Sequence, residues 1–316
     1  MMKYPRAERP TMHFIGVTTA SSSIMRIFPV WADYLGIEGV LNGIDFVPGA
    51  DPRLYRDAVA HIKADPQSLG ALVTTHKVNL LKASDDLFDD LDPFARTLHE
   101  VSSISKRGGK LIGHAMDPIT VGQALEALVP PGSWTDGNGQ VLILGSGGSA
   151  LALSLHLHNR AAEGDGPVKV TITAVDPVSL AEMQTVHAQI GLRFPVEYVL
   201  TSSPKDTDAV IAGLPQGSLV VNATGLGKDA PGSPTTDAVL YPLGTTVWEF
   251  NYRGDLTFLA QARAQEEARR LTVSDGWGYF IISWTCVIAE VFDIDIPTSG
   301  PLFEHLSQLA RESAGR

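Results

Sequence analysis

The chain has 316 residues, of which 44% are hydrophobic and 19% are charged, the composition of a globular protein with room for two domains. Its 35 acidic side chains outnumber 24 basic ones and give a formal net charge of −11. This charge argues against nucleic acid as the partner, because phosphate binding needs a basic surface.

Other composition features exclude further classes of protein. A single cysteine cannot form an intrachain disulfide or a cysteine-rich zinc site, and the nine histidines show no paired metal-ligand spacing, so we expect no metal. No apolar run is long enough for a membrane span, and the first ten residues lack the apolar core of a signal peptide. We therefore expect a cytoplasmic monomer or homodimer that binds a small molecule, without a membrane partner.

Strands and helices alternate in the first third of the chain, which predicts a mostly parallel α/β sheet. Apolar runs predict strands at 12–19, 39–49 and 69–75. The segments after these runs predict helices at 21–37, 51–65 and 76–91. Residues 100–117 then predict a β-hairpin around the turn Arg107-Gly108-Gly109.

A second alternation follows the Pro/Gly-rich residues 129–139, whose composition indicates a boundary. Leucines alternate over 151–157, a strand period, but we predict a helix because the preceding glycine turn and the Ala/Leu content favour one. The apolar runs of this part predict strands at 141–144, 169–176, 217–227 and 245–252. Closing helices are predicted at 280–293 and 301–315.

The glycine-rich residues 145–150, G-S-G-G-S-A, lie between a predicted strand and a predicted helix. Gly145 permits a tight turn, and Gly147 and Gly148 allow the backbone to approach a pyrophosphate, which the helix N-terminus stabilises. Ala150 replaces the last glycine of the G-x-G-x-x-G pattern, and the alternative is a tight turn without a ligand. The next strand ends in Asp176, whose carboxylate can accept hydrogen bonds from ribose hydroxyls and repels a 2′-phosphate, so NAD is favoured over NADP.

Lys77 follows an apolar strand and begins a helical stretch. Its position fits either a solvated charge or a group directed at a substrate, and the local sequence does not decide between them. The wider pattern does, because the chain resembles the shikimate dehydrogenase family in five segments taken in family order. These segments are T-H-K at 75–77, G-K-L-I-G-H-A-M-D at 109–117, the glycine turn, N-A-T-G-L-G at 222–227 and D-G-W-G-Y-F at 275–280.

The resemblance implies an α/β protein of two domains. Residues 1–118, with C-terminal helices at about 285–316, would form the substrate domain, and residues 119–284 a Rossmann NAD(P)-binding domain. The catalytic residues carried over are Lys77 and Asp117. The dinucleotide site carried over comprises Gly145, Ser146, Gly147, Gly148, Ser149, Ala150, Asp176, Asn222, Ala223, Thr224, Gly225 and Gly276.

Lys77 and Asp117 are expected to hold the reacting oxygen and move its proton while a hydride passes to or from the nicotinamide. A free lysine has a pKa of about 10.4; burial would lower that pKa and a neighbouring carboxylate would raise it. Which effect is larger stays open. His76 and His114, beside this pair, are interpreted as structural.

The substrate-binding residues of the family are largely altered here. Of its S-x-S pair, only Ser22 keeps a hydroxyl, because Ile24 occupies the second position, unless the pair is Ser21 and Ser23. Val73 and Ala115 replace polar residues. Ser102, Ser283 and Tyr252 complete the predicted substrate contacts, and Tyr252 alone keeps the family's residue type.

A missing partner for a buried hydroxyl costs about 1–3 kcal/mol, so shikimate itself is not the expected substrate. We expect a nicotinamide-dependent oxidoreductase for another small, carboxylated ring compound, with quinate or an aminated shikimate analogue within range. A non-catalytic nicotinamide-binding regulator on the same fold is the alternative. A folate-type dehydrogenase is a third, which the segment at 275–280 disfavours.

Overall fold

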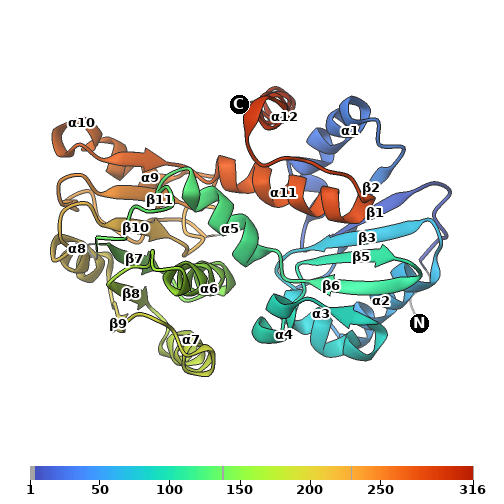
Figure 1. Ribbon diagram of the computed structural model, residues 1–316, viewed down its shortest axis with the longest axis horizontal. Helices are drawn as coiled ribbons and strands as arrows, with labels where there is room; N and C mark the ends of the chain where they lie inside the picture. Colours follow the sequence, from blue (N-terminus) through green and yellow to red (C-terminus); the bar gives the residue numbers. More distant parts are fainter. Residues whose placement is uncertain (1–3, 137–138, 229, 316) are drawn as a thin grey trace. The chain divides into compact units, whose positions relative to one another are not determined.

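The computed structural model describes residues 4–136, 139–228 and 230–315 (Figure 1). The chain divides into two compact units. The first unit combines residues 1–116 with residues 281–316, and the second is the continuous segment 117–280. The Pro/Gly-rich residues near 129–136 lie inside the second unit.

The first unit contains a mixed six-stranded sheet in the order β2-β1-β3-β5-β6-β4. The strands β2, β1 and β3 are parallel, whereas β3, β5 and β6 are joined in antiparallel pairs and β4 is parallel to β6. All six residues of β1 are buried, as expected for a strand covered on both faces. The elements are β1 (Thr11–Gly16), η1 (Thr19–Ser21), α1 (Ile24–Leu35), β2 (Val40–Asp45), α2 (Pro52–Ala64), β3 (Ser68–Val73), α3 (Lys77–Ser84), η2 (Asp85–Leu87), β4 (Asp90–Leu91), α4 (Pro93–Leu98), β5 (Ser103–Arg107) and β6 (Lys110–His114).

The helix predicted at 76–91 is shorter than expected. It begins at Lys77 and ends at Ser84, and after a short 3-10 turn the chain forms β4. Two carboxylates of this segment form ion pairs: Arg56 pairs with Asp86 at 2.5 Å and Lys63 with Asp89 at 3.0 Å. These contacts come from α2 and could not be read from the local pattern.

The C-terminal helices α11 (Trp277–Phe292) and α12 (Gly300–Ala314) complete the first unit, apart from the first turn of α11. In Figure 1, α12 lies beside α1. The indole Nε1 of Trp31 donates to the carbonyl of Leu306 at 2.8 Å, and Trp31 is 1% exposed. The resemblance to shikimate dehydrogenases implies this return of the last helix to the first domain.

The second unit contains a six-stranded sheet in the order β12-β11-β10-β7-β8-β9, in which every neighbouring pair is parallel. Numbered within the unit and read from β9, this order is 3-2-1-4-5-6, that of the Rossmann fold. Its elements are α5 (Asp117–Glu126), β7 (Gln140–Leu144), α6 (Gly148–Ala162), β8 (Lys169–Ala174), α7 (Pro177–Ile190), β9 (Val196–Leu200), α8 (Pro204–Ala212), β10 (Leu219–Asn222), β11 (Thr246–Glu249), α9 (Thr257–Arg263), α10 (Glu266–Arg269) and β12 (Thr272–Ser274). The predicted fold class, with a Rossmann second domain, is confirmed.

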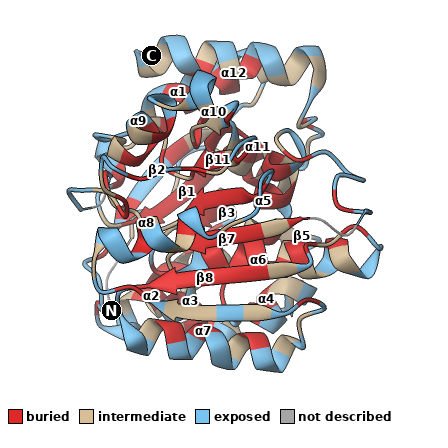
Figure 2. Cartoon of the chain, turned by 90° about the vertical axis from the view of Figure 1, so that its left-hand side faces the viewer, coloured by how far each residue is buried: buried red, intermediate tan, exposed pale blue. Residues whose placement is uncertain are grey.

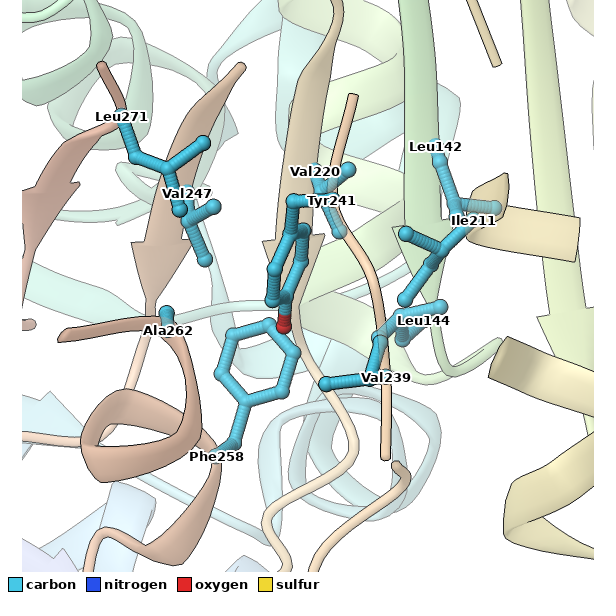
Figure 3. Close-up of a cluster of buried hydrophobic side chains, with 10 residues drawn as sticks. All are labelled: Leu142, Leu144, Ile211, Val220, Val239, Tyr241, Val247, Phe258, Ala262 and Leu271. Carbon is cyan, nitrogen blue, oxygen red and sulfur yellow. The ribbon is translucent and has the colours of Figure 1, made fainter. Parts of the chain in front are cut away.

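Burial in the second unit follows this architecture. Figure 2 shows β7 and β8 buried along most of their length, whereas α7 exposes its outer face. On the other side of the sheet, the rings of Tyr241 and Phe258 meet edge to face among aliphatic side chains of β10 and β11 (Figure 3). The parallel strands are thus fixed by apolar packing, which holds their carboxyl ends in place.

Candidate functional site

A cavity of about 540 Å³ lies in the second unit at the carboxyl ends of β7, β8, β9 and β10. Its lining comes from the glycine turn after β7, the end of β8, the start of α7, residues 201–204 and residues 223–224. Between β7 and β10 the strand order reverses direction, and in open α/β sheets ligands bind at this point. The position of the cavity is therefore that of a nucleotide site.

Gly145 is required by the backbone of the turn that forms this cavity. Its φ is +106°, and a Cβ atom would lie 2.8 Å from the carbonyl oxygen of Ala223. The N–H of Gly145 donates to the carbonyl of Thr173 at 2.8 Å. The N–H of Ala223 donates to the carbonyl of Leu144, also at 2.8 Å. The turn and the loop after β10 therefore hold each other in place.

Gly147 differs from Gly145, because nothing in the protein requires it to be glycine. Its φ of −85° and ψ of −176° are open to other residues, and a Cβ atom would have no heavy atom within 4 Å. It is the N-cap of α6 and lines the cavity. A missing side chain at this place leaves the free N–H groups of a 15-residue helix open to an anion.

The other residues of the predicted turn have different positions. The Ser146 hydroxyl lies 2.8 Å from the Ser179 hydroxyl, which joins the turn to α7. Gly148 is the first residue of α6. Ala150 is fully buried, so its small side chain serves packing rather than ligand contact.

Asp176 lies at the cavity and is the N-cap of α7. Its carboxylate accepts hydrogen bonds from the N–H groups of Ser179 at 2.9 Å and Val178 at 3.2 Å, and these bonds hold the pKa of the carboxyl below its usual value. A carboxylate has lone pairs for further donors. Among the described residues that line the cavity there is no lysine or arginine, so a 2′-phosphate would meet one negative charge and no positive one.

Lys77 is the first residue of α3, in the first unit. Thr75, two residues earlier, has φ +51°, and the N–H of His76 donates to the carbonyl of Thr74 across this turn. Proline cannot adopt a positive φ, so this turn excludes proline at position 75. The carbonyl of Lys77 accepts from the N–H of Val101 at 3.4 Å.

The His76 ring is engaged in structural hydrogen bonds. Its Nε2 lies 3.0 Å from the carbonyl oxygen of Phe46 and 3.2 Å from that of Gly16, so Nε2 carries the proton. Nδ1 then accepts from the Tyr55 hydroxyl at 3.0 Å. With 1% exposure, His76 fixes the segment before Lys77.

Asp117 is the first residue of α5 and opens the second unit. The residue before it, Met116, donates its N–H to the Ser102 hydroxyl at 2.8 Å. Ser102 is 3% exposed and lies directly before β5, so its hydroxyl anchors the end of the hairpin. His114, in the same hairpin, lies 2.9 Å from the Ser105 hydroxyl and 3.4 Å from the Glu290 carboxylate.

The positions at which the sequence replaces polar family residues are inside the core of the first unit. Ile24 and Ala115 are fully buried and Val73 is 1% exposed. Ser21 is exposed and Ser22 is half-buried, so the serine hydroxyls before α1 are the accessible ones. The Ser21 hydroxyl donates to the carbonyl of Thr18 at 2.8 Å.

Tyr252 lies in the second unit after β11. Its ring stacks on that of Phe280, with 4.2 Å between the ring centroids. The centroid of the Trp277 ring lies 6.1 Å away. Gly276 is buried and donates its N–H to the carbonyl of Asn251 at 3.0 Å. Asn222 is fully buried below the loop after β10, whereas Ala223 and Thr224 line the cavity.

The predicted site residues are thus divided between the units. The first unit holds Lys77, Ser22, Ser102 and Ser283, and the second holds Asp117, Tyr252 and all predicted dinucleotide contacts. Sequence reasoning missed the cavity wall at 201–204. A signal was present, because Ser203 and Asp206 form a capping box that marks the start of α8.

Metal-binding clusters and membrane-spanning helices are both absent from the described residues, 4–136, 139–228 and 230–315. No group of three or more His, Cys, Asp or Glu side chains there is arranged to hold a metal ion. Within the same ranges, no helix has the length and apolar character needed to cross a membrane.

These features define a two-domain α/β protein with a Rossmann-type nucleotide cavity. Comparison with known proteins gives the relatives of this class. The chain is 30% identical over 178 residues to the shikimate dehydrogenase (NADP(+)) of Lactococcus lactis subsp. cremoris MG1363, which is 56% of this chain and 59% of that protein. It is 31% identical over 183 residues to that of Streptococcus thermophilus, covering 56% and 58% of the two chains. The matched part is therefore less than two thirds of either relative. No known protein-family profile matches the chain.

Solved structures of similar fold span nearly the whole chain. The shikimate 5-dehydrogenase of Listeria monocytogenes superimposes with a TM-score of 0.73 at 17% identity, covering 98% of this chain and 99% of that one. The quinate dehydrogenase of Corynebacterium glutamicum superimposes with a TM-score of 0.71 at 19% identity, covering 95% of this chain and 98% of that one. The 5-ketofructose reductase of a Gluconobacter strain superimposes with a TM-score of 0.70 at 20% identity, covering 96% of this chain and 99% of that one. The resemblance to shikimate dehydrogenases is thereby confirmed.

Proposed function

We propose that this protein is a nicotinamide-dependent oxidoreductase of the shikimate and quinate dehydrogenase type. It would transfer a hydride between NAD(P) and a hydroxyl or keto group of a small carboxylated ring compound. The observation that carries the proposal is Gly147, a glycine that the fold does not need, at the N-terminus of α6 in a cavity at the switch point of a Rossmann sheet. The similarity to curated shikimate dehydrogenases supports it.

The cofactor is proposed to be NAD rather than NADP. The turn from Gly145 to Gly148 and the start of α6 would hold the pyrophosphate. Asp176 would accept hydrogen bonds from the ribose hydroxyls. The curated relatives carry NADP(+) in their names, so the acidic residue and the absence of basic residues from the described cavity lining are what favour NAD here.

Lys77 and Asp117 are proposed to act on the reacting oxygen of the substrate. A bound nicotinamide supplies the hydride acceptor or donor, and the protein must supply the group that moves the hydroxyl proton. Lys77 Nζ would give or take that proton and Asp117 would hold the lysine and the oxygen in place, an effect typically of about 10²–10⁴-fold on rate. Ser22, Ser102, Tyr252 and Ser283 would orient the substrate.

The substrate is proposed to differ from shikimate. The residue types of Ile24, Val73 and Ala115 support this, because an apolar side chain offers no hydrogen-bond partner to a ring hydroxyl. A compound with fewer or rearranged polar groups, such as quinate or an aminated analogue, fits these positions better. Its carboxylate would bind near the serines before α1.

The test is a panel of hydroxy and keto acids assayed by absorbance at 340 nm with NAD and NADP. Lys77→Ala should abolish turnover and leave NADH affinity nearly unchanged. Lys82→Ala, an exposed lysine on the same helix, is the matched control and should keep turnover. Loss of NADH binding in Lys77→Ala would contradict the assigned role. A protein that binds NADH but turns over none of a wide panel would instead support the non-catalytic regulator.

A further inference from the structure

Glu249, the last residue of β11, is a fully buried carboxyl that takes no part in the proposed chemistry. It accepts a hydrogen bond from the side-chain amide of Asn222 at 2.6 Å and another from the N–H of Asn251 at 2.8 Å. Buried acidic groups are rare unless paired, so each of these partners stabilises a group that would otherwise be costly to bury. Both partners belong to segments that reach the dinucleotide cavity or the predicted substrate contacts.

The orientation of the Asn222 amide follows from its partners. The N–H of Thr224 can only donate, and it lies 3.1 Å from Asn222 Oδ1, so this oxygen faces Thr224. The amide nitrogen then faces Glu249, which must accept. The Thr224 hydroxyl also donates to Asn222 Oδ1 at 2.7 Å and accepts from the N–H of Leu226 at 3.2 Å.

A second chain of contacts runs through Asn251. While its N–H donates to Glu249, its side-chain nitrogen donates to the carbonyl of Leu226 at 3.0 Å. Thr224 and Leu226 both line the cavity. Glu249 is therefore tied by two routes to the loop that forms one wall of the nucleotide site.

We propose that Glu249 is a positioning residue, which holds residues 223–226 in the shape that binds the dinucleotide by fixing Asn222 and Asn251. The inference rests on the proposed function, because it concerns the same cavity. A residue of this kind contacts neither substrate nor cofactor. It sets the geometry of the groups that do.

The charge of Glu249 is sensitive to pH in the working range. Burial raises the pKa of this carboxyl to about 7, against the opposing effects of its hydrogen bonds and of Lys228. The titratable groups coupled to it are Lys228, after β10, and Tyr241, before β11. The flanking strands contribute no charge, because β10 reads L-V-V-N and β12 reads T-V-S. Above pH 7 the carboxylate accepts both bonds, and below it the added proton weakens one of them.

The experiment measures NADH affinity by fluorescence titration from pH 5.5 to 8.5 in wild type, Glu249→Gln and Glu197→Gln. Glu197 is the matched control, because it lies in the same unit, is half exposed and pairs with Lys169. Wild-type affinity should fall about tenfold as the pH decreases through 7, the difference between a charged and a neutral hydrogen bond. Asp176, the titratable residue in the described lining, is charged throughout this range because its pKa is lowered.

Glu249→Gln should bind NADH about tenfold more weakly than wild type at pH 8.5 and show no titration, whereas Glu197→Gln should follow wild type. Equal pH profiles in all three proteins would overturn the inference while leaving the proposed function intact. Absence of NADH binding by wild type would overturn both. Should Glu249→Gln not fold, Glu249→Asp takes its place: its shorter carboxylate should loosen the bonds to Asn222 and Asn251 and weaken NADH binding at pH 8.5, and wild-type affinity in that variant would contradict the positioning role.

Discussion

Replacing Gly147 by alanine should separate the ligand role of the glycine turn from its structural role. The added Cβ meets no heavy atom within 4 Å, and φ −85° with ψ −176° is allowed for alanine. The free energy of unfolding should therefore be unchanged or higher by about 0.4–1 kcal/mol, because alanine restricts the unfolded chain. The new methyl group instead occupies the space in front of the α6 N–H groups, where the pyrophosphate is proposed to bind.

The loss of affinity can be estimated from the contacts that the methyl group would prevent. A hydrogen bond between an N–H and a charged group contributes about 1.5–3 kcal/mol. Losing one such bond weakens binding by about 10- to 100-fold, at about 1.4 kcal/mol for each factor of ten. Gly147→Ala should therefore bind NADH at least tenfold more weakly at full stability.

Gly145→Ala is the companion variant, in which the substitution should lower the stability of the fold. Its φ of +106° is unfavourable for alanine, and the Cβ would lie 2.8 Å from the carbonyl of Ala223. Strain of about 1–3 kcal/mol is expected in addition to that overlap, so this variant should unfold more easily. Urea denaturation and NADH titration on both variants make the comparison. Wild-type NADH affinity in Gly147→Ala, or a loss of stability equal to that of Gly145→Ala, would refute the reasoning.

Three further predictions concern charge and stability. Asp176→Ser and Asp176→Ala should both shift the cofactor preference from NADH towards NADPH, and an unchanged preference would contradict the role of the carboxylate. Only the alanine variant loses the α7 N-cap, so only this variant should have a lower melting temperature. Asp165→Ala should lower the free energy of unfolding, measured by urea denaturation, by about 3–5 kcal/mol, because it leaves the buried guanidinium of Arg160 without its ion-pair partner. A decrease below about 1 kcal/mol would show that this ion pair contributes little to stability. Burial lowers the pKa of His13 to about 4, below the unfolded value of about 6.5, so the unfolded chain binds more protons between these values. Stability should fall by up to about 3 kcal/mol as the pH decreases from 6.5 to 4, and His13→Gln should show a smaller loss.

The second sheet was largely predictable, because its central strands are buried on both faces and read as apolar runs. The run 141–144 is an example, with every residue of Val141–Leu144 buried. The edge strand β9 was not predicted. Its residues Val196–Leu200, V-E-Y-V-L, are partly buried or exposed, and their apolar run Tyr198–Leu200 is shorter than those of the buried central strands.

The candidate site was predictable where a local pattern carries the chemistry. The glycine turn and Asp176 follow strands at fixed positions, and both line the cavity. Glu249 was not predictable, because a carboxylate at the end of a strand looks like an exposed side chain until Asn222, 27 residues earlier, is known to face it. Partners brought together by the sheet leave no local signal.

The segment before Lys77 gives a physical argument for interpreting this lysine as functional. Thr75 adopts φ +51°, a conformation that is unfavourable for a residue with a branched Cβ and persists only where the surroundings impose it. The three hydrogen bonds of the buried His76 ring are such surroundings, and they act on the residue directly before the lysine. A solvated lysine needs no constraint of this kind, as the exposed Lys82 in the last turn of the same helix shows. A strained turn fixed by a buried histidine is instead what a lysine requires when its Nζ must reach one substrate oxygen reproducibly, because errors of about 1 Å in position can cost about 10²-fold in rate.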